Sequence, residues 1–151
     1  MINQLVEKHS DREKVYVYTD GSYKDGIYSG AFLVFRGLTC IYQDSGCGMK
    51  AASMHNIAGE LSAVMHAARW LKRNNYKATI IYDYTGIKHW AMREWKAKNE
   101  FTRAYQKFIY PYLEQMYITF RWVKGHDGDI GNTMADNLAR KALESRKEWN
   151  S

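Results

Sequence analysis

The chain has 151 residues, of which 46% are hydrophobic and 15% aromatic, and this composition excludes an intrinsically disordered protein. The formal net charge of +6 favours a polyanionic partner such as a nucleic acid, because cationic side chains release counterions from phosphates. No apolar run is long enough to cross a bilayer, and the isolated cysteines Cys40 and Cys47 are typical of a reducing compartment. We therefore expect a cytoplasmic monomer with free thiols and no membrane contact.

The first predicted strand, Val15–Thr19, is β-branched and aromatic throughout, as in a central strand that is buried on both faces. Turn-forming residues follow it at 20–26. Two more strands are expected near Ser29–Arg36 and Thr39–Asp44, and the short links between the three strands predict an antiparallel meander.

At Asn56 the hydrophobic spacing changes to three and four residues, which predicts a helix that ends at Asn74 and Asn75. A strand, two helices, a strand and a last helix should follow, at 78–82, 87–95, 105–116, 117–123 and 132–147. We expect Pro111 to kink the helix that contains it, and Asn132 to cap the last helix after a glycine-rich loop.

Helical crossovers to the later strands predict parallel pairing. The chain should therefore form an α/β fold in which a mixed five-stranded sheet carries helices on both faces. Residues 1–14 are polar and predict a flexible leader, whereas 15–147 should form one domain.

Four carboxylates occur where this fold would bring them together. Asp20 follows the first predicted strand and Asp83 the fourth, and parallel neighbours present such residues at one edge of the sheet. Glu60 in the first turn of its helix and Asp136 in the first turns of the last helix should reach the same edge. Two charges about 4 Å apart repel by about 4 kcal/mol at an effective dielectric constant near 20, so such a cluster requires cations.

Oxygen ligands select hard ions, here two Mg²⁺ ions with Mn²⁺ as a substitute, which would support in-line attack of water on a phosphodiester. Each carboxylate taken alone has an ordinary structural interpretation. Asp20 and Asp83 would be turn residues, Glu60 an acid that stabilises a helix N-terminus, and Asp136 part of a solvated face or a second helix cap. The metal hypothesis therefore depends on all four residues occurring in a compatible order.

The chain resembles the type 1 ribonuclease H family (ribonuclease HI-like) across about residues 15–145. Five segments carry the resemblance: Tyr18–Ser22, Gly59–Leu61, Tyr82-Asp83, Trp122–His126, and Asn132 with Ala135–Ala139. The resemblance implies a ribonuclease H-like fold and an endonuclease that hydrolyses the RNA strand of RNA–DNA hybrids by a two-metal mechanism, giving 5′-phosphomonoesters. It also implies that Asp20, Glu60, Asp83 and Asp136 bind the metals. His126, in a mobile loop, would assist proton transfer or product release.

Substrate binding is expected beside the metals. The backbone amides of Gly21 and Ser22, the Gly59 backbone and the Asn56 side chain are suited to contacting a ribose 2′-hydroxyl, and the resemblance places Asn132 near the scissile region. Two departures from the family pattern stand out. Tyr84 replaces a common serine, and the run His55–Gly59 retains only Asn56 of the residues that usually bind a DNA phosphate.

The two tryptophans Trp90 and Trp95 leave more than one interpretation. Helical spacing favours a core position for Trp90, whereas Trp95 is compatible with core packing or with stacking on a nucleic acid. Two functional alternatives also stay open. One is a DNA nuclease of the same fold, such as a transposase-like or junction-resolving enzyme, against which Asn132, Asp136 and His126 argue. The other is a non-catalytic nucleic-acid-binding module, against which the four retained carboxylates argue.

Overall fold

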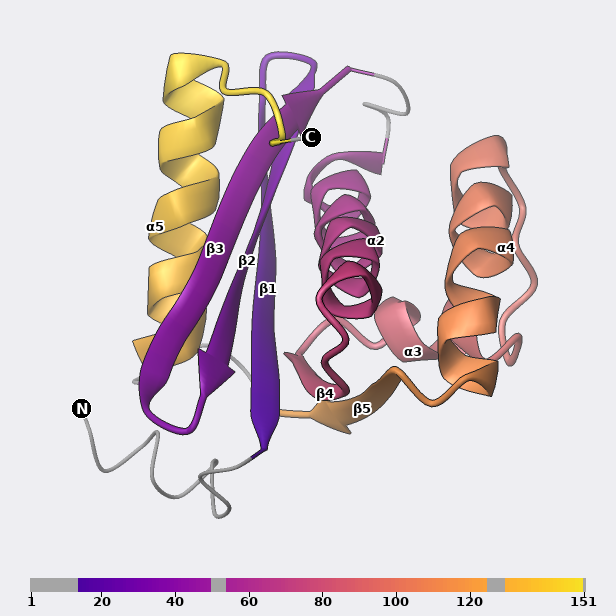
Figure 1. Cartoon of the computed structure of the whole chain (residues 1–151). Coiled ribbons are helices and arrows are strands. Elements are labelled where there is room, and N and C mark those ends of the chain that lie inside the picture. Colours follow the sequence, from indigo (N-terminus) through magenta and orange to yellow (C-terminus); the bar gives the residue numbers. More distant parts are fainter. Residues whose placement is uncertain (1–13, 50–53, 125–129, 151) are drawn as a thin grey trace.

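Five strands form a single mixed sheet in the computed structural model, which describes residues 14–49, 54–124 and 130–150. The strand order is β3-β2-β1-β4-β5 (Figure 1). The strands span Val15–Lys24, Ile27–Arg36, Thr39–Gly48, Ala78–Tyr82 and Ile118–Trp122, in the order β1 to β5. β1 to β3 pair antiparallel, whereas β4 lies parallel to both β1 and β5, which confirms the predicted meander and crossovers.

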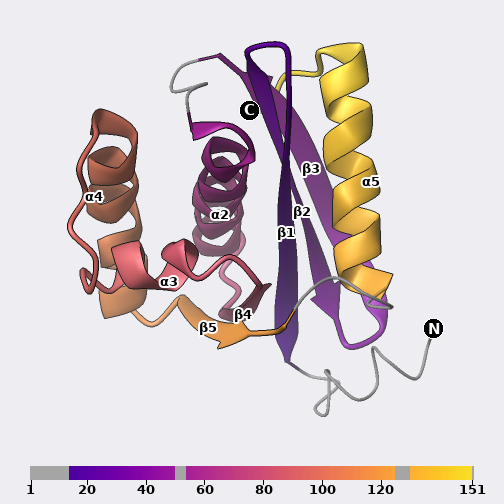
Figure 2. The ribbon, with the colours of Figure 1, turned by 180° about the vertical axis from the view of Figure 1, so that it is seen from behind.

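Helices cover both faces of the sheet, as expected (Figures 1 and 2). The described helices are α2 at Asn56–Arg73, α3 at Gly86–Ala91, α4 at Glu100–Glu114 and α5 at Ile130–Ser145. α5 packs across β1, β2 and β3 on one face, and α2 packs on β1 and β2 from the other, with α3 and α4 beyond it. No helix in the described part of the chain is long and apolar enough to span a membrane.

The core forms two layers because successive strand residues point to opposite faces of the sheet. In β1, Val17 faces α2 and Tyr18 faces α5, and both side chains are fully buried. The α2 layer includes Val34, Leu61, Leu71 and Ile80, and the α5 layer includes Leu33, Phe35, Ile81 and Ala135. Each fully buried aliphatic side chain contributes about 1.5–3 kcal/mol relative to its exposed state.

The first turns of α2 lie directly on the backbone of β1 and β2. A Cβ atom on Gly59 would overlap the carbonyl oxygen of Ser29, and a Cβ atom on Gly21 would overlap the carbonyl oxygen of Asn56. Only glycine at these positions allows helix and sheet to approach so closely. This contact sets the position of Glu60, which follows Gly59 in α2.

β1 is longer than predicted. It continues through Asp20 to Lys24, because β2 pairs with it along its full length, from Val15↔Arg36 to Lys24↔Ile27. The turn is confined to Asp25 and Gly26, whose φ angles of 51° and 80° are typical of a two-residue hairpin loop. The expectation that the first strand ends before Asp20 is therefore wrong, and β3 likewise extends beyond Asp44 to Gly48.

The helices also differ from the prediction at their ends. α3 stops at Ala91, before Trp95, and α4 begins after Asn99, whose side chain accepts a hydrogen bond from the Thr102 amide in a capping box. α5 begins at Ile130, so Asn132 is not its cap but a buried residue in its first turn. Pro111 lies inside α4, and the kink expected there stays a prediction.

Residues 146–150, called here the C-terminal strap, run from α5 onto β3. The carbonyl of Lys147 accepts a hydrogen bond from the Cys47 amide at 2.8 Å. The Lys147 ammonium lies 3.0 Å from the carboxylate of Asp44, a buried residue that also accepts a hydrogen bond from the Asn150 amide. Trp149 stacks on His66 of α2, with ring centroids 4.0 Å apart. Cys47 and Cys40 are both free thiols, as predicted.

Candidate active site

β1 and β4 separate at the edge of the sheet where Asp20 and Asp83 lie. Their last paired residues are Tyr18 and Ile81. Asp20 is two residues beyond this point, in the part of β1 that pairs only with β2, and Asp83 directly follows β4. The carboxyl end of two diverging parallel strands is a common ligand-binding position. The structure thus brings both residues to the predicted edge, although Asp20 lies inside a strand.

Glu60 reaches the same edge from α2. It is the fifth residue of that helix rather than part of its first turn, and it is buried. Burial, followed by the nearby charges of Asp20 and Asp83 and a hydrogen bond with Asp20, raises the pKa of Glu60 well above its ordinary value. Three of the four candidate carboxylates are therefore close enough to interact strongly.

These carboxylates open onto a pocket of about 330 Å³. Six side chains line it: Asp20, Asn56, Ile57, Glu60, Asp83 and Tyr84. The Oε2 atom of Glu60 is buried and has no hydrogen-bond partner. A buried, unpaired carboxylate oxygen is costly, so its presence points to a ligand that would satisfy it.

A hard divalent cation fits this donor set, because every acidic group in the pocket offers oxygen and Glu60 has an unused acceptor. Within the described residues, however, no group of three or more Asp, Glu, His or Cys side chains is already arranged as a metal site. The carboxylates thus influence one another without forming a finished coordination sphere.

Asp136 is placed differently from the other three carboxylates. It lies in the second turn of α5, outside the set of side chains that line the pocket, and it forms an ion pair with Arg140 at 3.1 Å. Its side chain is 45% exposed. The structure therefore assembles three of the predicted carboxylates in one pocket and holds the fourth on α5, which packs on the opposite face of the sheet from α2.

The remaining predicted residues are distributed around this site. Asn56 lines the pocket, whereas Gly59 is buried against the carbonyl of Ser29, so its backbone serves helix packing. Gly21 and Ser22 are half-buried in β1, and Ser22 lines a separate hollow that also includes Arg140. Asn132 is buried in α5. His126 lies outside the described residues.

Sequence reasoning missed three contributors to the site, namely Ile57 and Tyr84 in the pocket lining and Trp122 beside Asp83. Tyr84 lines the pocket, and burial together with the nearby Glu60 raises the pKa of its phenol. The indole N–H of Trp122 donates a hydrogen bond to the Asp83 carbonyl at 3.1 Å and so tethers the backbone at the end of β4. Tyr84 directly follows Asp83, and this adjacency was the only sequence signal for its place in the pocket.

Residues 12–144 match the RNase H family model. The chain belongs to the RNase H family. A ribonuclease H of Ruthia magnifica is 30% identical over 145 residues, which cover 87% of this chain and 96% of the relative. The expectation that the chain is a ribonuclease H enzyme is thereby confirmed.

Solved structures share the RNase H fold. The N-terminal RNase H domain of a Mycobacterium tuberculosis protein superposes with a TM-score of 0.73 at 19% identity, covering 88% of this chain and 95% of that one. LC11-RNase H1 in complex with an RNA/DNA hybrid gives a TM-score of 0.67 at 14% identity, covering 86% of this chain and 99% of that one. The predicted ribonuclease H-like fold is thus confirmed.

We expect the buried carboxylate of Glu60 to make the stability of this RNase H family member dependent on pH. Since the pKa of Glu60 is raised in the folded state, the folded protein binds its proton more tightly than the unfolded chain does. In chelator, the contribution of Glu60 to the free energy of unfolding should therefore fall as the pH rises from about 4.5, its ordinary pKa, through the raised value. Glu60→Gln should remove this dependence and melt at a higher temperature than the parent above that range.

Thermal melts in chelator between pH 5 and 9 test this prediction. Glu114→Gln, at the exposed end of α4, is the matched control and should follow the parent at every pH. A difference in melting temperature between Glu60→Gln and the parent that stays the same at every pH would contradict a raised pKa of Glu60 in the folded state.

Proposed function

We propose that the chain is an endonuclease that hydrolyses the RNA strand of RNA–DNA hybrids and leaves 5′-phosphomonoesters. The observation that carries the proposal is the pocket that Asp20 and Asp83 share with Glu60, whose buried Oε2 atom has no hydrogen-bond partner. Membership of the RNase H family supports the same activity.

Asp20, Glu60 and Asp83 would hold divalent cations in this pocket, with Asp136 joining them from α5. Two Mg²⁺ ions, or Mn²⁺ in their place, would supply an activated water and stabilisation of the leaving oxygen. The protein's own part is to orient the carboxylates, while the cations would offset the burial and the mutual repulsion that oppose ionisation of Glu60. Gly21 and Gly59 bring Glu60 against β1, and the Trp122 indole fixes the backbone carbonyl of Asp83. His126 is proposed to transfer a proton or to aid product release.

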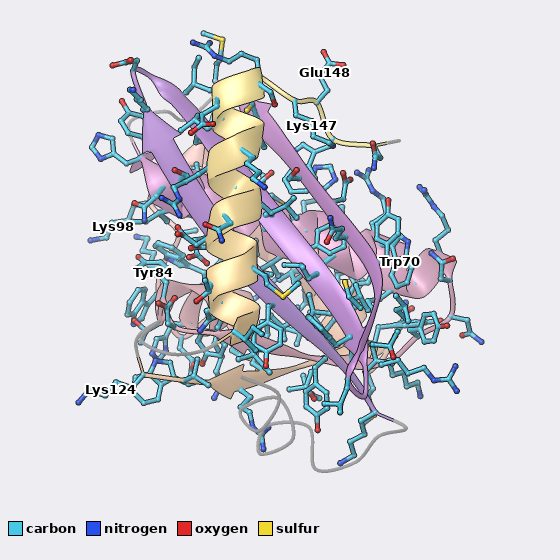
Figure 3. The ribbon with its side chains drawn as sticks, turned by 90° about the vertical axis from the view of Figure 1, so that its left-hand side faces the viewer. Trp70, Tyr84, Lys98, Lys124, Lys147 and Glu148 are labelled. Carbon is cyan, nitrogen blue, oxygen red and sulfur yellow. The ribbon has the colours of Figure 1, made fainter. Side chains whose placement is uncertain are left out.

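An aromatic and basic surface beside the pocket would hold the nucleic acid. Tyr84 contacts the ring of Trp90 at a centroid distance of 6.0 Å, and Trp90 in turn meets Trp95 at 5.5 Å. Both tryptophans line a hollow of about 600 Å³ that also includes Lys96 and Lys98. In Figure 3, Lys98, Tyr84 and Lys124 lie along one edge of the molecule, opposite Trp70.

Half-buried Trp90 packs partly against the core, as expected, whereas Trp95 is 39% exposed. Aromatic faces stack on nucleic acids and lysines neutralise phosphates, so this surface suits a polyanionic strand. LC11-RNase H1, which has the same fold, was solved with an RNA/DNA hybrid bound. We propose the same class of partner for this chain.

Selection of RNA is proposed to depend on the 2′-hydroxyl, the group that distinguishes the two sugars at a given site. Asn56 lines the pocket with the carboxylates, and Gly21 and Ser22 directly follow Asp20 in β1, so the Asn56 side chain and the backbone at Gly21 and Ser22 are proposed to contact the 2′-hydroxyl. Asn132 would support the scissile region from within α5. We further propose that the protein works as a cytoplasmic monomer without a membrane partner.

Cleavage of matched duplexes tests the proposal. With Mg²⁺, the protein should cut an RNA–DNA hybrid and should leave double-stranded RNA and double-stranded DNA intact. In a duplex whose one strand carries a short run of ribonucleotides, cuts should fall within or beside that run, and a single embedded ribonucleotide should be a poor substrate.

The other outcomes separate the alternatives. Cleavage of double-stranded DNA would indicate a DNA nuclease of the same fold. Binding of the hybrid without cleavage in either Mg²⁺ or Mn²⁺ would indicate a non-catalytic module. Efficient cutting at a lone ribonucleotide would contradict the proposed contacts to successive sugars.

A further inference from the structure

Arg140 and Asp136 form a local pair on the surface of α5. One terminal nitrogen of the guanidinium lies 3.1 Å from Oδ2 of Asp136 and donates a hydrogen bond of 2.6 Å to the side-chain oxygen of Asn137. The residues are four and three positions apart, the spacings at which side chains meet on a helix. Contacts with Asp136 and Asn137 therefore hold the guanidinium of Arg140 beside the Asp136 carboxylate.

This pair distinguishes Asp136 from the other three candidate ligands. Glu60 is influenced by Asp20 and Asp83, and all three line one pocket, from which Asp136 is absent. The carboxylate of Asp136 instead faces a fixed positive charge on its own helix. Asp136 thus has a cationic partner in the described structure before any metal is bound.

We propose that Arg140 is a positioning residue that holds Asp136 on α5 and competes with a divalent cation for its carboxylate. The inference rests on the proposed function, in which Asp136 is the fourth metal ligand. Arg140 would then lower the affinity of the site for the last metal ion and ease that ion's release.

The exposure of both side chains makes such competition feasible. The side chains of Arg140 and Asp136 are 58% and 45% exposed, and ion pairs in this setting are weak enough for a divalent ion to displace. The positive charge of Arg140 also disfavours a cation at the same carboxylate. Removing the guanidinium should therefore strengthen metal binding rather than weaken it.

The test is a cycle of variants with Mn²⁺ as the probe, its binding measured by electron paramagnetic resonance on the full chain. Arg140→Gln should tighten the weakest Mn²⁺ site by about 1.5- to 5-fold, the range of an exposed ion pair. Lys141→Gln, the next residue on α5, removes the same charge and should change the affinity by much less. Arg140→Lys should leave the Mn²⁺ affinity close to the parental value, because a lysine keeps the charge and reaches the same carboxylate.

The double variant tests whether Arg140 affects Mn²⁺ binding through the carboxylate of Asp136. In an Asp136→Asn background, Arg140→Gln should no longer affect Mn²⁺ binding, since the carboxylate for which both cations compete is gone. Equal effects of Arg140→Gln and Lys141→Gln, or an effect that persists in the Asp136→Asn background, would overturn the inference.

Failure of the inference can be told from failure of the proposed function. If Asp136→Asn alone leaves Mn²⁺ binding unchanged, Asp136 is not a ligand and the proposed four-carboxylate site is wrong. If Asp136→Asn weakens binding but Arg140→Gln does not alter it, the metal site stands and only the role of Arg140 is rejected. Hybrid binding in Ca²⁺ gives a second readout, because a loss of affinity there with unchanged Mn²⁺ binding would reassign Arg140 to a substrate phosphate.

Discussion

Asp20→Asn and Asp83→Asn should each lower the rate of hybrid cleavage by far more than about tenfold while leaving the fold intact. Each substitution keeps the shape of the side chain and removes the charge that a hard cation requires. Single-turnover cleavage in saturating Mg²⁺, with circular dichroism to verify folding, measures the effect. Either variant retaining more than about a tenth of the parental rate would contradict the two-metal assignment.

Asp25→Asn provides the control for these substitutions. It makes the same chemical change five residues from Asp20, at an exposed turn position with a φ of 51°, which asparagine tolerates well. Its cleavage rate should match that of the parent. In chelator, Asp20→Asn should also melt at a higher temperature than the parent, because it removes one of the charges that oppose ionisation of buried Glu60.

Gly59→Ala should be the most damaging single methyl addition to the fold. Alanine normally stabilises a helix relative to glycine, but here the added carbon would overlap the backbone carbonyl of Ser29, which a paired strand cannot move. We expect a loss of at least about 3 kcal/mol, with α2 displaced from the sheet. This corresponds to a fall in melting temperature of about 6–12 °C for a domain of this size.

Gly26→Ala separates this steric overlap from the conformational cost of placing alanine at a positive φ angle. Gly26 has a φ of 80° and open space around its α-carbon, so alanine there should cost only about 1–2 kcal/mol. Denaturant melts of both variants give the comparison. Similar losses for Gly59→Ala and Gly26→Ala would show that α2 does not depend on close contact with the sheet.

Much of the architecture could be predicted because its signals are local. The apolar spacing from Asn56 to Asn74 defined α2 to within a residue at each end, and the run Ala78–Tyr82 defined β4. Link lengths then gave the strand directions, since short turns join antiparallel strands and helices join parallel ones.

Features that depend on tertiary contacts could not be predicted in the same way. Asp20, Gly21 and Ser22 have the composition of a turn, yet they continue β1 because β2 supplies hydrogen-bonding partners along the whole hairpin. The local preference of such residues is weak compared with a complete strand ladder. α3 and the following segment were misjudged for the opposite reason, because Trp90 and Trp95 mimic one helical face while the chain leaves the helix at Met92.

The candidate site was likewise predictable only where its signals lie in the order of residues along the chain. The order of Asp20, Glu60 and Asp83 along the elements predicted their convergence, and the structure places them together. The pairing of Asp136 with Arg140 required side-chain geometry, and so did the contact of Trp122 with the Asp83 backbone across β4 and β5. The family resemblance identified residue types but carried no information about these partners.

The C-terminal strap also has a consequence for behaviour at high concentration. β3 is an outer strand of the sheet, and such strands expose amide and carbonyl groups that can recruit a strand from another molecule. Lys147 occupies one of these positions with its carbonyl, and the Trp149 ring lies against Gly46, so part of this edge is already occupied within the chain. Loosening the strap would expose β3 to intermolecular pairing, and the first sign of damage there should be self-association and precipitation rather than loss of catalytic chemistry.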